Sequence, residues 1–348
     1  MIKYLGSKRA LMPVLETLFA ASQARTALDL FTGTTRVAAA MKQLGMQVTA
    51  VDTASYSEVF SKTFIELDAT NADLRELADA VASLNQLSGT SGYFTEVFCQ
   101  KARYFQVKNG QRIDAVRSII ESDYKNSWMY YPLLASLLIA ADKVDSTTGV
   151  QMAYLKTWSR RSSLELELQV PELLAGGGRS IRGDAIEQTP NLGSFDLAYL
   201  DPPYNQHRYF GNYHIWETLV RWDQPEYYGI ANKRVDTRSN ENKSAFNSKL
   251  TLPNALATVI AGLDVKTLVL SYNNESWLSR RELTDMCSKF EAVEILDFDS
   301  KRYVGSQIGG YNKSGRLVGK PGAPRNLEHI VITGQGQKVS AMIKALTQ

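Results

Sequence analysis

Short runs of β-branched and apolar residues alternate with helical patterns along most of this chain, and this alternation limits the fold more than any other feature. Strands separated by helices form mostly parallel sheets that carry helices on their faces. The sequence therefore predicts a doubly wound α/β sheet with about seven strands. The seven runs lie at residues 27–31, 47–52, 180–184, 195–201, 267–273, 291–298 and 328–333.

A long segment, residues 53–179, separates the second and third of these strands, and an ordinary crossover is far shorter. Residues 113–121 and 132–143 have helical spacing, and Gly176-Gly177-Gly178 is expected to be the hinge that returns the chain to the sheet. We therefore expect a mainly helical inserted domain at 57–176, with the sheet domain formed by 1–56 and 177–348. A polar stretch at 227–249 is expected to be a mobile surface segment.

Composition excludes several classes of protein. The longest apolar run, residues 130–141, is too short for a bilayer, which needs about 20 apolar residues. The first residues lack the apolar segment of a signal peptide. The two cysteines, Cys99 and Cys287, lack CxxC spacing, so we expect neither a disulfide framework nor a zinc site and place the protein in a reducing cytoplasm. A net charge of +3 permits a nucleic-acid partner without requiring one.

The run FDLAYLDPPY, residues 195–204, is an apolar strand followed by an acid, two prolines and an aromatic ring. Ligands of such sheets lie at the carboxyl ends of the strands. Prolines fix the backbone, so the Asp201 carboxylate and the Pro202 carbonyl would form two rigid acceptors beside the Tyr204 ring. They suit the amino group of a flat base such as adenine. Hydrogen bonds from this group would localise the lone pair of its nitrogen. The alternative is a plain turn after a buried strand.

The run ALDLFTGTTRV, residues 27–37, is a strand that ends in an acid and continues into a glycine-containing turn. Gly33 would let the backbone approach a ligand, and Asp29 could accept a hydrogen bond from an ammonium group. The next strand ends at Asp52, about 20 residues further on, where an acid typically binds ribose hydroxyls. For Asp52 the alternative is a strand-terminal cap.

These motifs together resemble the adenine-N6 DNA methyltransferases of the alpha arrangement, in particular the FokI-methyltransferase-like and Dam-like group. The resemblance covers nearly the whole chain. It rests on KYLGSKRAL (3–11), the stretch 29–37, Asp52, RGDA (182–185) and DPPY (201–204), with further similarity at NYHIWETLVRWD (212–223) and YVGSQIGG (303–310).

The resemblance implies a Rossmann-like methyltransferase fold with a mixed seven-stranded sheet and an inserted helical target-recognition domain. It implies S-adenosylmethionine as the cofactor, S-adenosylhomocysteine as the product, and a flipped adenine in duplex DNA as the substrate. The implied catalytic residues are Asp201, Pro202 and Tyr204. The implied cofactor-binding residues are Tyr4, Lys8, Asp29, Phe31, Gly33, Thr34, Asp52 and Asp184, of which Asp184 bonds the amino group of the cofactor adenine.

This chain departs from many relatives at Thr35, where their cofactor loop has a second glycine. No metal is expected, because a sulfonium leaves as a neutral group and His207 and His214 lack a third clustered ligand. Neither cysteine has the Pro-Cys context of cytosine carbon-5 methylation, and a cytosine amino-group enzyme would more typically carry Ser in place of Asp201.

DNA contacts are expected from basic residues of the insert and of a late loop. The remaining alternatives are an RNA adenine methyltransferase and a catalytically silent DNA-binding module. Double-stranded DNA is the expected partner, a cognate restriction endonuclease is compatible with the sequence, and a prokaryotic or phage source is expected. The candidate DNA-binding residues are Lys101, Arg103, Lys108, Arg112, Arg160 and Lys313.

Overall fold

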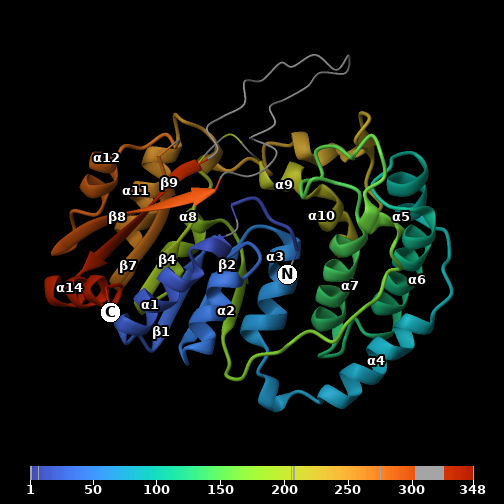
Figure 1. Ribbon diagram of the computed structural model, residues 1–348, viewed down its shortest axis with the longest axis horizontal. Coiled ribbons are helices and arrows are strands. Elements are labelled where there is room, and N and C mark those ends of the chain that lie inside the picture. Colours follow the sequence, from blue (N-terminus) through green and yellow to red (C-terminus); the bar gives the residue numbers. More distant parts are fainter. Residues whose placement is uncertain are drawn as a thin grey trace. The chain divides into compact units, whose positions relative to one another are not determined.

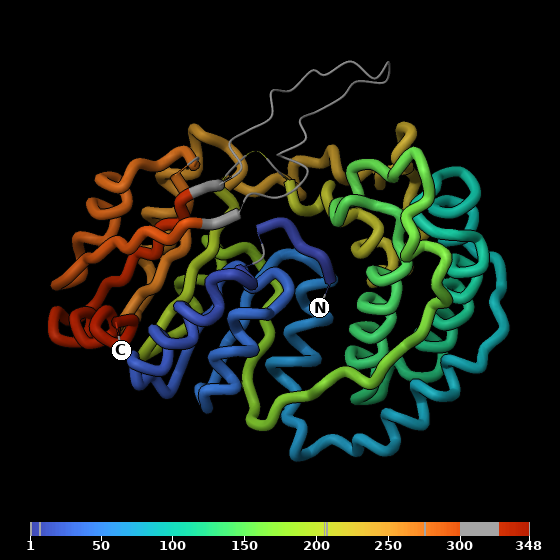
Figure 2. The backbone as a smooth tube through the Cα atoms, in the orientation of Figure 1, coloured from blue at the N-terminus to red at the C-terminus, as the bar shows by residue number. Residues whose placement is uncertain are grey.

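The computed structural model describes residues 2–6, 8–204, 206, 208–274, 276–301 and 325–347. The chain forms two compact units, each made of segments far apart in sequence, and Figure 2 traces the course of the backbone by colour. Unit 1 comprises Met1–Ser7, Thr32–Asp184 and His207–Ser244. Unit 2 comprises Lys8–Phe31, Ala185–Gln206 and Ala245–Gln348.

The main sheet has seven strands in the order β3-β2-β1-β4-β7-β9-β8 (Figure 1). The pairs β2/β3, β1/β4 and β4/β7 are parallel, whereas β9 runs antiparallel to both β7 and β8. The expected mixed seven-stranded α/β sheet is confirmed, with strand ends shifted by a few residues. The strands are β1 (Thr26–Leu30), β2 (Gln47–Asp52), β3 (Arg179–Arg182), β4 (Ser194–Leu200), β7 (Asp264–Asn273), β8 (Ala292–Lys301) and β9 (Arg325–Gly334).

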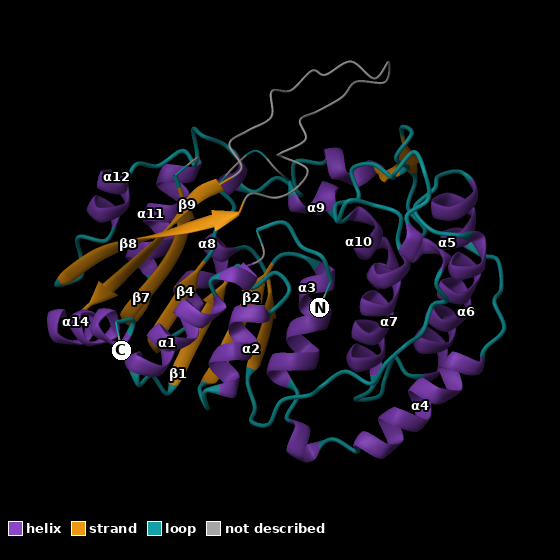
Figure 3. Cartoon of the chain, in the orientation of Figure 1, coloured by secondary structure: helices purple, strands orange, loops and turns teal. Residues whose placement is uncertain are grey.

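Unit 2 holds the strand that carries the DPPY motif and the helices packed near it (Figure 3). Residues 197–200 of β4 are all buried, as expected for a parallel strand covered on both faces. Helix α1 begins with Pro13 near its first position and buries Leu15, Leu18 and Phe19 at helical spacing. The helices of this unit are α1 (Met12–Ser22), α8 (Ala185–Gln188), α11 (Leu252–Gly262), α12 (Arg280–Met286) and α14 (Gly336–Ala345).

Unit 1 contains the two helices that the sequence predicts, at α6 and α7. Helix α7 is apolar almost all round and is correspondingly buried, including Leu133, Leu134, Leu137 and Leu138. The helices are α2 (Arg36–Gln43), α3 (Ser55–Ser61), α4 (Leu74–Gln86), α5 (Tyr93–Thr95), α6 (Val107–Asp123), α7 (Tyr130–Val144), α9 (Tyr209–Asn212) and α10 (His214–Arg221). None of the helices in the described ranges is long and apolar enough to cross a membrane.

Gly178 occupies the point where the chain enters β3. A Cβ atom there would lie 2.6 Å from the Ile65 carbonyl oxygen and 2.7 Å from that of Val48. Only glycine allows this close approach of three backbone segments. The Lys42 ammonium also donates to the Ile65 carbonyl, at 2.8 Å, and to that of Leu67 at 2.7 Å, so it satisfies carbonyls at the end of a π-helical turn.

Arg117 of α6 is a cation buried to 1% exposure. Its Nε donates to the Leu219 carbonyl at 2.8 Å and its Nη2 to the Val220 carbonyl at 2.9 Å, near the end of α10. Its Nη1 bonds Glu121 at 2.8 Å, and the Trp222 ring centroid lies 5.2 Å from its guanidinium carbon. One side chain therefore joins α6 to α10 and satisfies carbonyls that the helix end leaves open.

The expectation of a surface segment at 227–249 is wrong for part of that stretch. It contains a two-stranded ribbon, β5 (Tyr227–Tyr228) with β6 (Lys233–Arg234), and it buries Arg234 and Phe246. The Arg234 guanidinium bonds Asp223 at 2.7 and 2.6 Å and Asp236 at 3.0 and 2.8 Å. Two carboxylates compensate the burial of this charge. Arg234 can therefore be buried although the composition of the stretch is polar.

His214 is fully buried at the start of α10. Its Nε2 lies 3.0 Å from the Gln151 carbonyl oxygen. Burial lowers the pKa of His214 to about 3, so the imidazole is neutral in the folded protein at neutral pH and that nitrogen donates.

We expect His214 to make stability fall in acid. Because the folded-state pKa is about 3 and the unfolded value is near 6.5, the unfolded chain binds the extra proton between these values. Stability from this group is intact above pH 6.5 and is lost as pH falls toward 3, by roughly 2–3 kcal/mol at pH 4.5. Urea unfolding at pH 7 and 4.5 measures the free energy of unfolding. On going to pH 4.5, the unaltered protein should lose more of it than His214→Asn does, by that amount. Equal losses in the two proteins would refute the assignment.

Candidate active site

The DPPY residues follow β4 in unit 2 and meet Lys8, which lies in the 3₁₀ turn Lys8–Ala10. The Lys8 Nζ is 2.9 Å from Asp201 Oδ1 and 4.0 Å from Glu328 Oε2. It also lies 5.7 Å from the centroid of the Tyr204 ring. The exposed fractions of the Lys8, Asp201 and Glu328 side chains are 6%, 20% and 12%, so these three charges interact largely out of water.

Burial and charge act against each other in this group. Burial raises the pKa of Asp201, and the Lys8 ammonium partly offsets that rise. For Lys8 burial alone would lower the pKa, but Asp201, Tyr204 and Glu328 together raise it well above its ordinary value. Lys8 therefore remains an ammonium, and the structure places it on the Asp201 carboxylate.

The Tyr204 ring is held from the side by Tyr272 of β7. The two ring centroids are 5.3 Å apart at 65°, and the Asn273 side chain bonds the Tyr204 hydroxyl. Burial raises the pKa of Tyr204, so the hydroxyl stays protonated. Pro202 is buried, and the tetrad presents a carboxylate beside a fixed ring, a combination that fits an N–H donor on a flat heterocycle.

A second group of predicted residues, in unit 1, surrounds the Asp52 carboxylate at the end of β2. Asp52 Oδ2 accepts the Gly33 N–H at 2.8 Å, and Oδ1 accepts the Ala54 N–H at 3.0 Å. Gly33 has φ +53°, and a Cβ there would lie 2.9 Å from Tyr4 Cε1. The sequence motif thus brings Tyr4, Gly33 and Asp52 together, and glycine is required by both its backbone angle and its contact.

Tyr4 belongs to a cluster of four tyrosines. Its ring stacks on Tyr213 at 4.9 Å and 16° and on Tyr209 at 5.3 Å and 29°, and it meets Tyr56 edge-on at 6.3 Å. The Tyr213 hydroxyl accepts the Leu5 N–H at 2.6 Å, which fixes the N-terminal segment. None of these three partners of Tyr4 was expected from the sequence. For Tyr56 the sequence did hold a signal, because this residue closely follows Asp52 in the chain.

The remaining residues of the cofactor loop have unusual backbone angles. Thr35 has φ +61°, so it adopts the left-handed conformation that glycine favours, and its N–H donates to the Thr32 carbonyl at 2.8 Å. Thr34 beside it is buried. In unit 2, Phe31 has φ +85° and its ring meets Phe246 at 4.9 Å. Thr35, where many relatives have a second glycine, therefore keeps the backbone turn of the loop.

The two other predicted acids end strands. Asp29 is buried in β1 of unit 2. Asp184 of unit 1 is half-buried after β3, where the Gly183 N–H donates to the Asp52 carbonyl at 2.9 Å. The residue directly before Asp184 is thus hydrogen-bonded to the backbone of Asp52.

Most candidate DNA-binding residues contact the protein itself. Lys101 pairs with Glu96, Lys108 pairs with Glu165, and Arg112 donates to the Asn85 carbonyl at 2.9 Å. Arg103 donates to the Leu155 carbonyl at 3.0 Å, and Arg160 is exposed. Lys313, His207 and the stretch 303–310 lie outside the described residues. Among those described, no group of three or more His, Cys, Asp or Glu could hold a metal.

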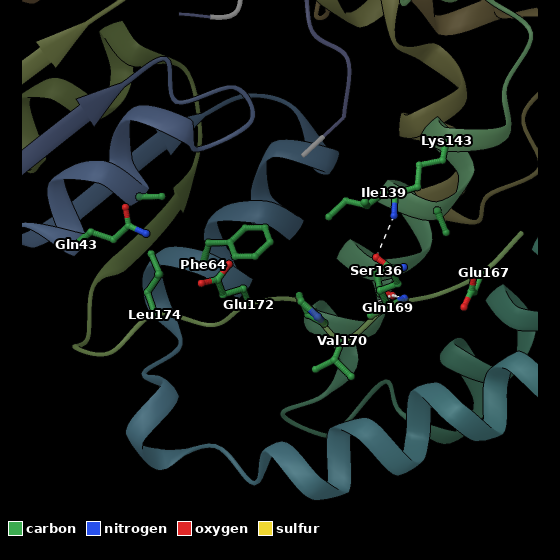
Figure 4. A pocket seen from close by; sticks show the side chains of 13 residues that line it. Gln43, Phe64, Ser136, Ile139, Lys143, Glu167, Gln169, Val170, Glu172 and Leu174 are labelled. Atoms are coloured by element: carbon green, nitrogen blue, oxygen red, sulfur yellow. Dashed lines mark hydrogen bonds between the residues drawn. The ribbon is translucent and has the colours of Figure 1, made fainter. Parts of the chain in front are cut away.

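A cavity of about 280 Å³ in unit 1 lies apart from the residues above (Figure 4). It is lined by α2, by α7 and by residues 167–174, with Phe64, Ile139 and Val170 among its apolar side chains. The Ser136 hydroxyl donates to the Gln169 carbonyl at 2.6 Å. None of the predicted catalytic or cofactor-binding residues lines this cavity.

Comparison with known proteins identifies the family. The model of D12 class N6 adenine-specific DNA methyltransferases matches residues 4–286. The chain is 30% identical over 321 residues to modification methylase StsI of Streptococcus sanguinis, covering 87% of this chain and 48% of that protein. It is 30% identical over 318 residues to type II methyltransferase M.NlaIII of Neisseria lactamica, covering 87% and 92%.

It is also 26% identical over 327 residues to type II methyltransferase M.FokI of Planomicrobium okeanokoites, covering 87% and 50%. The chain spans about half the length of the StsI and FokI methylases that it matches. The chain belongs to the D12 class N6 adenine-specific DNA methyltransferase family, which confirms the expectation from its motifs.

Proposed function

We propose that the protein is a site-specific DNA adenine methyltransferase, which moves the methyl group of S-adenosylmethionine to the N6 amino group of an adenine flipped out of duplex DNA. The observation that carries the proposal is the largely buried Asp201 carboxylate beside the Tyr204 ring at the end of β4. Family membership supports it.

Three parts of the tetrad act on the base. The Asp201 carboxylate and the Pro202 carbonyl accept the two amino N–H groups, which localises the nitrogen lone pair and aims it. The Tyr204 ring stacks on the flipped base and offsets part of the unstacking cost of a few kcal/mol. As the new C–N bond forms, the bond between the methyl group and sulfur breaks and leaves a neutral thioether. The amino nitrogen becomes cationic beside Asp201, and it then passes a proton to water to regain neutrality.

The polar groups of the cofactor loop fit S-adenosylmethionine, which supplies a methyl group on a positively charged sulfur. In unit 1, Asp52 suits ribose hydroxyls, Asp184 suits the amino group of the cofactor adenine, and Gly33 with Thr34 forms the turn of the loop, where the Tyr4 ring packs on Gly33. Tyr4 offers an aromatic face. In unit 2, Asp29 and Phe31 at the end of β1 suit the methionine part, and Lys8 acts on Asp201. We assign no metal.

Recognition of DNA is proposed for the insert at 57–176, and catalysis for 1–56 with 177–348. An exposed aromatic and basic surface of unit 1 supports this assignment. Within the insert, the Arg103 guanidinium carbon lies 5.4 Å from the exposed Trp158 ring. The ammonium of Lys233, which follows the insert in the chain, lies 3.1 Å from the Met152 sulfur of the insert. The Tyr104 hydroxyl holds both supporting loops, at 2.8 Å from the Gln151 carbonyl and 3.0 Å from the carbonyl of residue 231. Aromatic rings beside cationic side chains are typical of surfaces that bind nucleic acid.

The relatives are named modification methylases and type II methyltransferases. We therefore propose that the chain modifies DNA against a cognate restriction endonuclease.

The test is transfer of labelled methyl from S-adenosylmethionine to three polymers: an adenine-containing DNA duplex of mixed sequence, a duplex of G·C pairs only, and a structured RNA with adenines. We expect label in the mixed duplex and none in the G·C duplex. Label in RNA alone would establish the RNA methyltransferase instead. Cofactor binding without transfer to any polymer would contradict the catalytic proposal and favour a DNA-binding module.

A further inference from the structure

Glu328 is a buried carboxylate that no motif of the sequence marks. It lies in β9, where it pairs in register with Asn273 of β7. Its Oε2 has no hydrogen-bond partner among the described residues. The neighbouring His329 side chain instead bonds Asp297 at 2.7 Å. A buried carboxylate oxygen without a donor is costly, so a nearby cation must account for its place.

That cation is Lys8. Its ammonium is 2.9 Å from Asp201 and 4.0 Å from Glu328, so the two carboxylates share one positive charge, with Asp201 in closer contact. The other titratable groups facing Lys8 are the hydroxyls of Tyr199 and Tyr204. Because a lysine side chain ends in flexible single bonds, a shift of about 1 Å would bring its ammonium to hydrogen-bonding distance from Glu328.

The proposed reaction creates a need for this shift. Asp201 must accept and polarise the adenine amino group, but the Lys8 ammonium on its Oδ1 offsets the negative charge of the carboxylate, so that the free Oδ2 is a weaker acceptor. We propose that Glu328 is a positioning residue that takes over the Lys8 ammonium when the target amino group binds Asp201. The inference rests on the proposed function. The exchange replaces one ion pair by another and moves no proton.

Without Glu328, Lys8 would leave Asp201 only by becoming an unpaired buried charge, which is strongly unfavourable. Replacing Glu328 by Gln should therefore lock Lys8 on Asp201 and weaken productive binding of the base. This weakening of base binding should depend on Lys8 and should vanish when Lys8 is absent.

The first test reads Lys8 itself and needs no DNA. In protein labelled with ¹³C at lysine Cε, the Lys8 signal is assigned with Lys8→Met and titrated. In Asp201→Asn, we expect the pKa of Lys8 to fall by less than about one unit, because Glu328 takes the ammonium. In Asp201→Asn with Glu328→Gln, a fall of about two units or more is expected, because burial is unopposed. A large fall in the single Asp201 variant would overturn the inference, including the case in which the double variant does not fold.

The second test is kinetic. Glu328→Gln should lower kcat/KM for DNA on the order of 10- to 100-fold with unchanged cofactor affinity, and Glu328→Asp should recover part of it. In the Lys8→Met background, the same change should cost less than about threefold. Glu294→Gln on the exposed side of β8 serves as the control. Equal losses in both backgrounds would overturn the inference. If the unaltered protein transfers no methyl group, the proposed function fails separately, and the Lys8 titration still decides whether Glu328 holds Lys8.

Discussion

Asp201→Asn should lower kcat for methyl transfer to duplex DNA on the order of 10³-fold while changing the Kd for S-adenosylmethionine by less than about twofold. The amide keeps the size of the carboxylate but loses the charge that polarises the amino group and balances the cationic nitrogen. It also turns one acceptor into a donor that opposes the amino N–H. Single-turnover rates and cofactor binding by calorimetry measure the two quantities.

Asp196→Asn is the matched control for this change. Asp196 lies on the same strand, β4, and pairs with Lys266 at 2.7 Å through a side chain that is 21% exposed. It lies at the opposite end of the strand from the tetrad, so its substitution should leave kcat within about twofold. Full activity of Asp201→Asn would show that the tetrad carboxylate does not act on the base.

Arg117→Met should lower the free energy of unfolding by about 3–5 kcal/mol. The substitution leaves the Leu219 and Val220 carbonyls without their donor and removes the buried one of the two cations that pair with Glu121. Methionine fills similar volume, so the loss reports on the polar contacts rather than on a cavity. Urea unfolding at neutral pH measures the change.

Lys125→Met provides the comparison, since Lys125 pairs with the same Glu121 but its side chain is 60% exposed. Water screens this pair, so we expect a change below about 1 kcal/mol. Similar losses for the two substitutions would mean that Arg117 contributes through charge alone and that its bonds to α10 matter little.

The sheet was predictable because most of its strands are local apolar runs that alternate with helical patterns, although β3 has the polar sequence RSIR. The tetrad was predictable because four consecutive residues carry its chemistry. The ordered motifs assign Tyr4, Gly33 and Asp52 to one cofactor site, and these residues do contact one another; their role in binding the cofactor stays a prediction.

Contacts between distant segments were not predictable in the same way. Glu328 has no local pattern, and it reaches Lys8 only because β9 pairs antiparallel with β7. Arg234 was expected at the surface, because the neighbouring Asp236 alone does not show that Asp223 also pairs with the guanidinium and that the side chain is buried. Tyr209 and Tyr213 look like ordinary helix residues until the fold stacks Tyr4 on them. In each case a tertiary contact overrides what composition indicates.

The most direct test of the account is the chemical identity of the product. DNA incubated with the protein and S-adenosylmethionine is hydrolysed to nucleosides and analysed by mass spectrometry, beside a sample treated with Asp201→Asn. We expect N6-methyladenine at one sequence context from the unaltered protein and almost none from the variant. Methylation of cytosine, or equal N6-methyladenine from both proteins, would contradict it.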